Sequence, residues 1–199
     1  MRQTSRREFM TVAAGLSALA AAARTLDGAE ALPLRPTPSC PGSAPPTERQ
    51  TAGPYFKPDS PLRASLLEPG IAGTKIVLTG TVLSTACQPV ARALFDVWHA
   101  DDHGDYDTAG FRLRGHQFTD DQGRYRLETI VPGAYAGRTR HFHVKVQAPS
   151  RPALTTQLYL PGEAANARDP IFSRDLVMQV GDTAEGKMAT FDFVLDLGR

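Results

Sequence analysis

Between Lys75 and Val146 no stretch of the sequence repeats apolar residues at the interval of about 3.6 residues that marks an amphipathic helix. The chain consists instead of short apolar or alternating runs divided by turn signals such as Asp121-Gln122-Gly123 and Pro132-Gly133. This pattern is typical of an antiparallel β-sandwich or barrel, and it predicts an all-β domain. The expected strands span Ile76–Leu83, Leu94–Trp98, Tyr125–Thr129, Phe142–Val146, Gln157–Leu160 and, at an edge, Phe191–Leu195.

A proline-rich segment, residues 32–62, precedes these strands and holds nine of the chain's 16 prolines. Because proline lacks an N–H and fixes φ, such a segment sustains neither a helix nor a central strand. We therefore expect an extended N-terminal arm that follows the surface of the domain. A chain of 199 residues suffices for one sandwich, which we place at residues 63–199.

The first 31 residues are expected to be a leader that is separate from the fold. Ser5-Arg6-Arg7-Glu8-Phe9-Met10 is a twin-arginine pattern, and the apolar run Thr11–Ala23 that follows has 13 residues. This run is shorter than the roughly 20 residues that span a bilayer and suits a signal peptide. We expect cleavage after Ala31, with Ala23 as the alternative, and export to the periplasm or outside the cell without a membrane span in the mature protein. An uncleaved amphipathic anchor is the competing interpretation.

The net charge of the sequence indicates which classes of binding partner to expect. Beyond residue 31 the sequence holds 18 basic and 18 acidic residues, so its net charge is zero. It contains no basic block of the kind that binds nucleic acid. A neutral surface favours a small molecule or a neutral polymer as the partner, and it is compatible with a homo-oligomer.

The two cysteines, Cys40 and Cys87, both lie in the part that is expected to be exported. In an oxidising compartment an even pair predicts a disulfide, here between the arm and the sandwich. The alternative, a pair of metal thiolates, lacks the close Cys-x-x-Cys spacing of zinc and iron–sulfur sites.

Residues 138–146, Arg-Thr-Arg-His-Phe-His-Val-Lys-Val, carry the strongest indication of chemistry. Alternate side chains of a strand share a face, so His141 and His143 point one way while Phe142 points into the opposite layer. Two imidazoles that are two residue rises apart, about 7 Å, can bind one ion. A lone His-x-His pair can equally be an exposed polar stretch of a strand.

Two tyrosines strengthen the metal interpretation. Tyr135 follows the turn Pro132-Gly133-Ala134, and Tyr106 lies in a polar loop after the strand that ends at Trp98. A phenolate is a strong anionic oxygen donor, which suits a hard, high-valent ion such as iron(III). Two phenolates and two neutral imidazoles leave one positive charge on Fe(III), which a bound hydroxide would cancel, and a neutral site is tolerated away from water.

Three segments resemble motifs of the intradiol ring-cleavage dioxygenases, the family that includes protocatechuate 3,4-dioxygenase and catechol 1,2-dioxygenase. They are residues 94–106 (LFDVWHADDHGDY), 129–135 (TIVPGAY) and 138–146. The resemblance runs from about Thr51 to Gln179, and the leader and single short domain look closest to the exported, stand-alone members. It implies that family's β-sandwich and Fe(III)-dependent cleavage of a catechol by O2 to a cis,cis-muconate-type dicarboxylic acid.

Carried over residue by residue, the resemblance also implies the site. One non-haem Fe(III) per chain is held by Tyr106, Tyr135, His141 and His143. Tyr135 has a catalytic part as well, because it accepts a proton from the incoming catechol.

The resemblance further makes Arg138 and Gln157 residues that contact the substrate and take part in catalysis. It places Gly53-Pro54-Tyr55 at the mouth of the substrate pocket, with Tyr55 against the substrate. The flanking Thr51-Ala52 departs from the family's more usual Thr-Glu.

Other interpretations remain open at this point. The domain can be a non-catalytic binding module, or a zinc or copper hydrolase that uses His99 together with His141 and His143. His99 is otherwise expected to form hydrogen bonds in the core or at its rim, and Tyr125 and Tyr159 are expected to be packing residues. Arg138, instead of facing a substrate, can pair with an acid such as Asp105 or Asp107.

Overall fold

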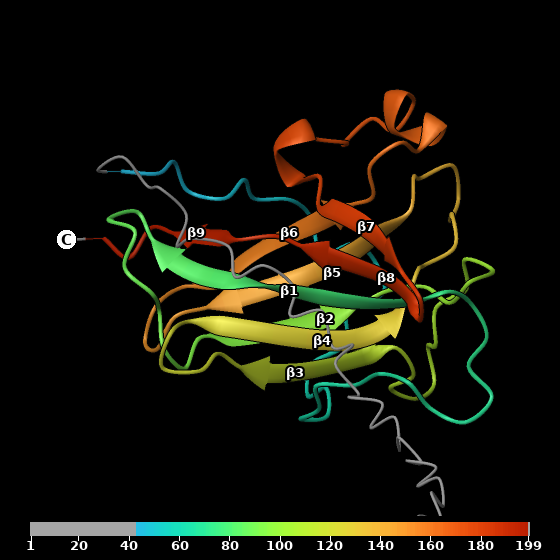
Figure 1. The fold of residues 1–199 in the computed structure, drawn as a ribbon, viewed down its shortest axis with the longest axis horizontal. Coiled ribbons are helices and arrows are strands. Elements are labelled where there is room, and N and C mark those ends of the chain that lie inside the picture. Colours follow the sequence, from blue (N-terminus) through green and yellow to red (C-terminus); the bar gives the residue numbers. More distant parts are fainter. Residues whose placement is uncertain (1–42, 199) are drawn as a thin grey trace, which may run out of the picture. The chain divides into compact units, whose positions relative to one another are not determined.

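The computed structural model describes residues 43–198, so the predicted leader, the start of the arm and Cys40 lie outside the described residues. The described part is a β-sandwich of two overlying sheets, which confirms the predicted fold class (Figure 1). One sheet has the order β4-β1-β8-β7, with β9 also paired to β1, and the other has the order β3-β2-β5-β6. The strands are β1 (Lys75–Ser84), β2 (Leu94–Trp98), β3 (Arg114–Phe118), β4 (Arg124–Ile130), β5 (His141–Gln147), β6 (Leu154–Tyr159), β7 (Gln179–Thr183), β8 (Gly186–Thr190) and β9 (Phe193–Leu195).

The core fills the space between the two sheets. Strand β1 contributes Ile76 and Leu78 to it, and β5 contributes Phe142 and Val144, as the alternation of the sequence predicts. Tyr125 of β4 is the packing residue that was expected. Its ring stacks on Phe95 with centroids 4.0 Å apart, and its hydroxyl donates to the Phe191 carbonyl at 2.7 Å.

Three short strands, β3, β7 and β8, were not expected from the sequence. Their sequences, RGHQF, QVGDT and GKMAT, are polar or contain glycine and show no regular apolar alternation. Strand β6 also begins earlier than expected, at Leu154. Most neighbours are antiparallel, but β1 pairs in parallel with β8 and β9, so the first sheet is mixed.

The described part of the proline-rich arm is extended and crosses the outer face of the β3-β2-β5-β6 sheet. At one end the Gln50 N–H donates to the Thr155 carbonyl of β6 at 2.8 Å, and at the other the His116 N–H of β3 donates to the Pro61 carbonyl at 2.9 Å. Between these ends Phe56 packs 4.9 Å from the Trp98 ring of β2. This sheet is therefore covered on both faces, by the core and by the arm.

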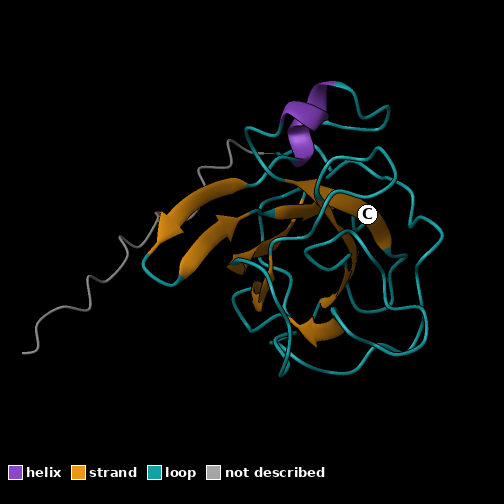
Figure 2. Cartoon of the chain, turned by 90° about the vertical axis from the view of Figure 1, so that its right-hand side faces the viewer, coloured by secondary structure: helices purple, strands orange, loops and turns teal. Residues whose placement is uncertain are grey.

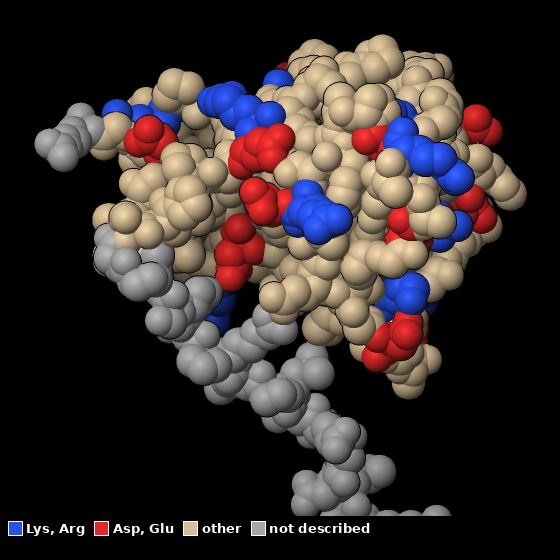
Figure 3. All heavy atoms as spheres, turned by 90° about the horizontal axis from the view of Figure 1, so that it is seen from above, with Lys and Arg blue, Asp and Glu red and all other residues tan. Residues whose placement is uncertain are grey.

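The connection from β6 to β7 is the longest excursion from the sandwich and contains the only helical turns of residues 43–198, coloured purple in Figure 2. These are two 3-10 turns, η1 (Ala164–Ala167) and η2 (Arg174–Leu176). Within residues 43–198 no helix has the length and apolar character needed to cross a bilayer. On the face shown in Figure 3, basic and acidic side chains lie in adjacent groups of both signs.

Candidate metal centre

The two histidines of β5 lie on the outer face of the β3-β2-β5-β6 sheet, under the arm. Phe142 between them points into the core, so their opposite direction follows from the strand alternation. Both are buried, with 3% of His141 and 4% of His143 exposed. In the register of the sheet, His143 is flanked by Trp98 on β2 and Gln157 on β6.

The ring nitrogens of the pair converge. The Nε2 atoms of His141 and His143 are 3.1 Å apart. The His141 Nδ1 lies 2.6 Å from the Thr139 carbonyl, to which it donates its proton, so Nε2 presents a lone pair. Burial lowers the pKa of His141 to about 4 and that of His143 well below its ordinary value, so both rings are neutral near pH 7.

Tyr106 and Tyr135 approach the histidines from two loops. Their rings meet edge to face with centroids 5.5 Å apart, and the Tyr106 ring lies 6.1 Å from that of His143. Burial raises the pKa of Tyr106 far above its ordinary value. Its phenol therefore ionises only where a strong positive charge compensates for the lost hydration.

The two tyrosine loops are held together by close backbone contact at two glycines. The Gly133 N–H donates to the Asp101 carbonyl at 2.6 Å. A Cβ atom on Gly104 would lie 2.2 Å from the Ala134 carbonyl oxygen, and one on Gly133 would lie 2.4 Å from the Gly104 nitrogen. Only glycine allows this approach, which sets the spacing of the tyrosines that follow each glycine.

Arg114, which the sequence did not single out, ties the Tyr106 loop to the arm. Its side chain is buried at 2% exposure. One terminal nitrogen donates to the Tyr55 carbonyl at 2.6 Å, and the other donates to the Asp107 carbonyl at 2.9 Å. The Asp107 carboxylate in turn accepts the N–H groups of Ala109 and Gly110 at 2.9 and 2.7 Å and so shapes the loop.

The geometry of the two histidines suits neighbouring ligands of one metal ion. Two nitrogens at about 2.1 Å from one ion and 3.1 Å from each other subtend roughly a right angle, as neighbouring ligands of a metal do. In the described part of the chain, no group of three or more His, Cys, Asp or Glu side chains could hold an ion. An ion held by the histidine pair would need further donors, and the phenols of Tyr106 and Tyr135 lie beside it.

His99 does not join the cluster. Its Nε2 lies 2.7 Å from the Thr129 hydroxyl and its Nδ1 lies 2.7 Å from the Ala100 carbonyl, so both nitrogens are in hydrogen bonds. The ring packs edge to face on Phe142, on the core side of the sheet. The expected core role of His99 is therefore found, and the hydrolase triad with His141 and His143 is not assembled.

Tyr55, predicted to contact substrate, covers the tyrosine pair. Its ring stacks on Tyr106 at 4.4 Å with an angle of 10° between the planes, and it meets Tyr135 edge to face at 5.4 Å. The neighbouring Tyr135 hydroxyl raises the pKa of Tyr55. A Cβ atom on Gly53 would lie 3.1 Å from His143 Cε1, so the Gly53-Pro54-Tyr55 segment follows the site at van der Waals distance.

Arg138 lies beside the cluster, and its partner is an acid that the sequence did not indicate. Its Nε donates to Asp169 Oδ2 at 2.7 Å, and one terminal nitrogen donates to Gln157 Oε1 at 2.7 Å. The suggested pairing with Asp105 or Asp107 is therefore wrong. Asp169 comes from the β6–β7 connection, 31 residues further along the chain.

Tyr159 has a polar part in addition to the packing role that was expected. Its hydroxyl lies 2.8 Å from Gln50 Oε1, 3.1 Å from the Ile171 carbonyl and 3.2 Å from Gln157 Oε1. Burial raises its pKa to about 12. In the sheet register Tyr159 lies opposite His141, and no local sequence pattern indicated this placement.

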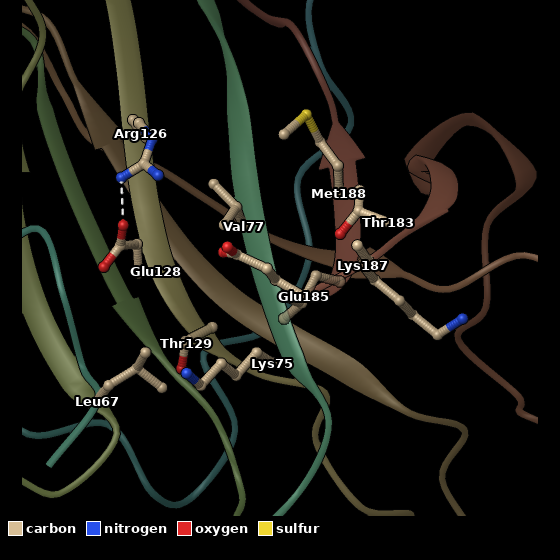
Figure 4. Close-up of a pocket in the computed structure, with 12 residues that line it drawn as sticks. Leu67, Lys75, Val77, Arg126, Glu128, Thr129, Thr183, Glu185, Lys187 and Met188 are labelled. Atoms are coloured by element: carbon tan, nitrogen blue, oxygen red, sulfur yellow. Dashed lines mark hydrogen bonds and ion pairs between the residues drawn. The ribbon is translucent and has the colours of Figure 1, made fainter. Parts of the chain in front are cut away.

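Two of the hollows on the surface of the described residues are of interest here. One of about 390 Å³ adjoins Tyr106 and is lined by Asp101, Asp105, Asp107, Arg112 and Leu113. The other, of about 440 Å³, lies over β1, β4 and the β7–β8 hairpin and shares no residue with the cluster (Figure 4). In it Val77 and Met188 form an apolar floor, and Arg126 is paired with Glu128 at 2.6 Å.

Comparison with known proteins identifies the family of the chain. The family model described as "Dioxygenase" matches residues 51–197. A protocatechuate 3,4-dioxygenase beta chain of Burkholderia cepacia is 35% identical over 150 residues, covering 61% of this chain and 63% of that protein. A hydroxyquinol 1,2-dioxygenase of Nocardioides simplex is 31% identical over 150 residues, covering 63% of this chain and 51% of that protein.

A solved structure gives the same result. The dioxygenase domain of a dioxygenase carbohydrate-binding protein fusion from the cellulolytic bacterium Streptomyces sp. SirexAA-E superposes with a TM-score of 0.76 and 52% identity, covering 77% of this chain and all of that one. Fold and cluster thus define a β-sandwich protein in which two half-buried tyrosines lie beside two buried histidines. The chain belongs to the intradiol ring-cleavage dioxygenase family. It spans about half to two thirds of the length of the two curated relatives.

Proposed function

We propose that this chain cleaves the ring of a catechol-type diol between its two hydroxyl-bearing carbons, with iron(III) as its cofactor. Both atoms of O2 enter the product, a cis,cis-muconate-type dicarboxylic acid, so that catechol and O2 are consumed in equal amounts without another reductant. The observation that carries the proposal is the convergence of the His141 and His143 Nε2 atoms, 3.1 Å apart, beside Tyr106 and Tyr135 in a chain of this family.

The four side chains would hold one iron(III) per chain. When bound, the ion supplies Lewis-acid activation of the catechol and of its ring toward O2. The chain contributes two neutral imidazoles, since burial keeps the pKa of both histidines low. Tyr106 is half-buried, and its ring stacks on that of Tyr55, which covers one face of it.

Tyr135 and Arg138 act on the substrate in this proposal. Tyr135 is only half-buried, so its phenolate oxygen can accept a proton from a catechol hydroxyl as the diol enters. The guanidinium of Arg138 is a fixed positive charge beside the cluster, and it stabilises negative charge that develops on the ring.

Gln157 connects the arginine to the arm. Its amide oxygen accepts from Arg138 at 2.7 Å, and its Nε2 donates to the Thr51 carbonyl at 3.0 Å. The side chain is fully buried next to His143 in the sheet register. We assign it a contact with the bound diol or O2 that adds to this connecting role.

The direct test measures iron, colour, oxygen uptake and product on one preparation. About one iron per chain, a broad visible band from tyrosinate-to-iron charge transfer, and one O2 per catechol cleaved are expected. Screening catechol, protocatechuate, hydroxyquinol and chlorocatechols identifies the diol. A protein that stays colourless and inactive after anaerobic iron loading and reoxidation contradicts the proposal.

We also propose export through the twin-arginine route and a Cys40–Cys87 disulfide. The support for export is the Arg6-Arg7 pattern with its short apolar run. The disulfide is supported by the arm's path, since the Ala44 N–H donates to the Thr85 carbonyl at 3.1 Å, within the turn that carries Cys87. Sequencing the N-terminus of secreted material tests the leader.

A further inference from the structure

The Asp169 carboxylate is fully enclosed at the end of the β6–β7 connection, with 0% of its side chain exposed. Oδ2 accepts from Arg138 Nε at 2.7 Å and from the Thr139 N–H at 2.9 Å, and Oδ1 accepts from the Ile171 N–H at 3.1 Å. Burial by itself raises the pKa of Asp169, but hydrogen bonds from Arg138, Thr139 and Ile171 outweigh it and leave the pKa below its ordinary value. The carboxylate thus accepts three hydrogen bonds, and both of its oxygens are in use.

These contacts fix the plane of the Arg138 guanidinium. Nε is held by Asp169 on one side, and Nη2 is held by Gln157 at 2.7 Å and lies 3.4 Å from the Tyr159 hydroxyl. Among residues 43–198, Nη1 alone of the three nitrogens has no hydrogen-bond partner. The fork is rigid, so holding two nitrogens determines the direction of the third.

We propose that Asp169 is a positioning residue, which orients Arg138 so that Nη1 is the donor presented to the bound diol. The inference rests on the proposed function and assigns to that reaction a residue outside the matched motifs. A guanidinium that is free to rotate keeps its charge, but its Nη1 no longer points in one fixed direction. Misplacement by about 1 Å can lower the rate of a positioned reaction by about 100-fold.

A purely structural role is the competing explanation, because Asp169 also holds the Thr139 and Ile171 backbone. Asp169→Asn keeps the shape and removes the charge. Asp120→Asn is a matched control, since Asp120 accepts from Arg124 Nε at the same 2.7 Å and from two backbone N–H groups. Both variants are measured for iron content, for anaerobic catechol binding from the change in the visible band, and for turnover.

We expect Asp169→Asn to keep its iron, to bind catechol within about threefold of the parent, and to lose about 10- to 100-fold in kcat. Asp120→Asn should match the parent. In an Arg138→Ala background, Asp169→Asn should change kcat by less than about threefold, because residues that act through one another are not additive. A further tenfold loss in that background assigns Asp169 to the structure alone and overturns the inference.

Arg138→Lys provides a test that does not remove the buried acid. It keeps a charge opposite Asp169 but lacks the fork, so its kcat should fall within about threefold of that of Arg138→Ala. A kcat within threefold of the parent overturns the inference even if Asp169→Asn fails to fold. A parent protein that never cleaves any diol contradicts the proposed function, whereas an active parent with a normal Asp169→Asn contradicts only the positioning role.

Discussion

The Nε2 atoms of His141 and His143 lie 3.1 Å apart. The two rings share one face of the sheet because Phe142 between them points into the core on the other face. Without an ion, two neutral imidazoles at this distance can share one proton in an N–H···N hydrogen bond, and with an ion both lone pairs can face the cation. We propose that a cation takes the place of this proton, with the two tyrosines as further ligands. The first predictions therefore concern that cation.

Tyr106→Phe should abolish or strongly shift the visible band, because the charge-transfer donor is lost with the phenol oxygen. Absorption spectra and iron content of the purified variant provide the measurement. Tyr125→Phe is the matched control, since the Tyr125 hydroxyl bonds to the Phe191 carbonyl within the core. An unchanged band in Tyr106→Phe would exclude Tyr106 as a ligand.

Gly133→Ala should lower the iron content and the stability together. Its methyl group would lie 2.4 Å from the Gly104 nitrogen and force apart the loops of Tyr106 and Tyr135. Gly181→Ala is the control, because a methyl group there meets no atom within 4 Å. The measurement is the iron content of each purified variant. Equal iron in Gly133→Ala and Gly181→Ala would contradict the idea that the contact between the loops sets the spacing of the tyrosines.

Arg138→Ala should lose about 10²- to 10³-fold in kcat while the iron band and its response to catechol survive. A preorganised charge at a developing negative charge is typically worth about 3–4 kcal/mol. Steady-state oxygen uptake gives kcat, and Arg124→Ala, which removes an exposed arginine paired with Asp120, serves as control. Activity of Arg138→Ala within threefold of the parent rules out the catalytic role.

Acid should destabilise the domain partly through His99. Burial lowers its pKa to about 4, whereas the unfolded chain titrates near 6.5. Between these values the unfolded state binds more protons, so stability is full above about pH 6.5 and falls as the pH drops toward 4, by up to about 3 kcal/mol. Urea denaturation of the parent and His99→Gln across this range should show a flatter dependence in the variant. Parallel curves would mean that His99 is not protonated on unfolding.

Replacing both Cys40 and Cys87 with serine should cost about 4 kcal/mol of stability on the chain-entropy model. Iron content should not change, because the predicted ligands lie outside the cross-linked loop. Thermal unfolding of native and variant proteins measures the loss, and mass spectrometry of unreduced protein detects the bond. Two free thiols in native exported material would falsify the pairing.

Much of this architecture was predictable because it depends on local patterns. Alternation along residues 141–146 places the histidines on one face and Phe142 on the other, and the long strand β1 was found from its apolar periodicity. The pair Pro132-Gly133 predicts a turn from the sequence alone. The positions of Tyr106 and Tyr135 in their loops came from a family resemblance to motifs, not from periodicity.

What could not be predicted depends on contacts between distant segments. Asp169 lies in an irregular connection, and nothing near it in the sequence shows that its partner is Arg138. Arg114 is part of a short strand without apolar alternation, so neither β3 nor the buried guanidinium was indicated. The roles of such residues depend on hydrogen-bond partners that are distant in the sequence, and a local sequence pattern does not reveal those partners.

The long-range contacts of the arm imply that the site assembles in a definite order during folding. Gln50 donates to the Ile171 carbonyl across 121 residues, and the Thr51 carbonyl accepts from Gln157 across 106. A ribosome makes the arm first, but its anchoring partners emerge only when most of the sandwich has been synthesised. Closing such long loops before any contact forms is entropically unfavourable, so the arm should dock after the sheets have paired. Before it docks, the arm does not cover the two histidines of β5, so we expect a metal ion to reach them most easily at this late stage of folding.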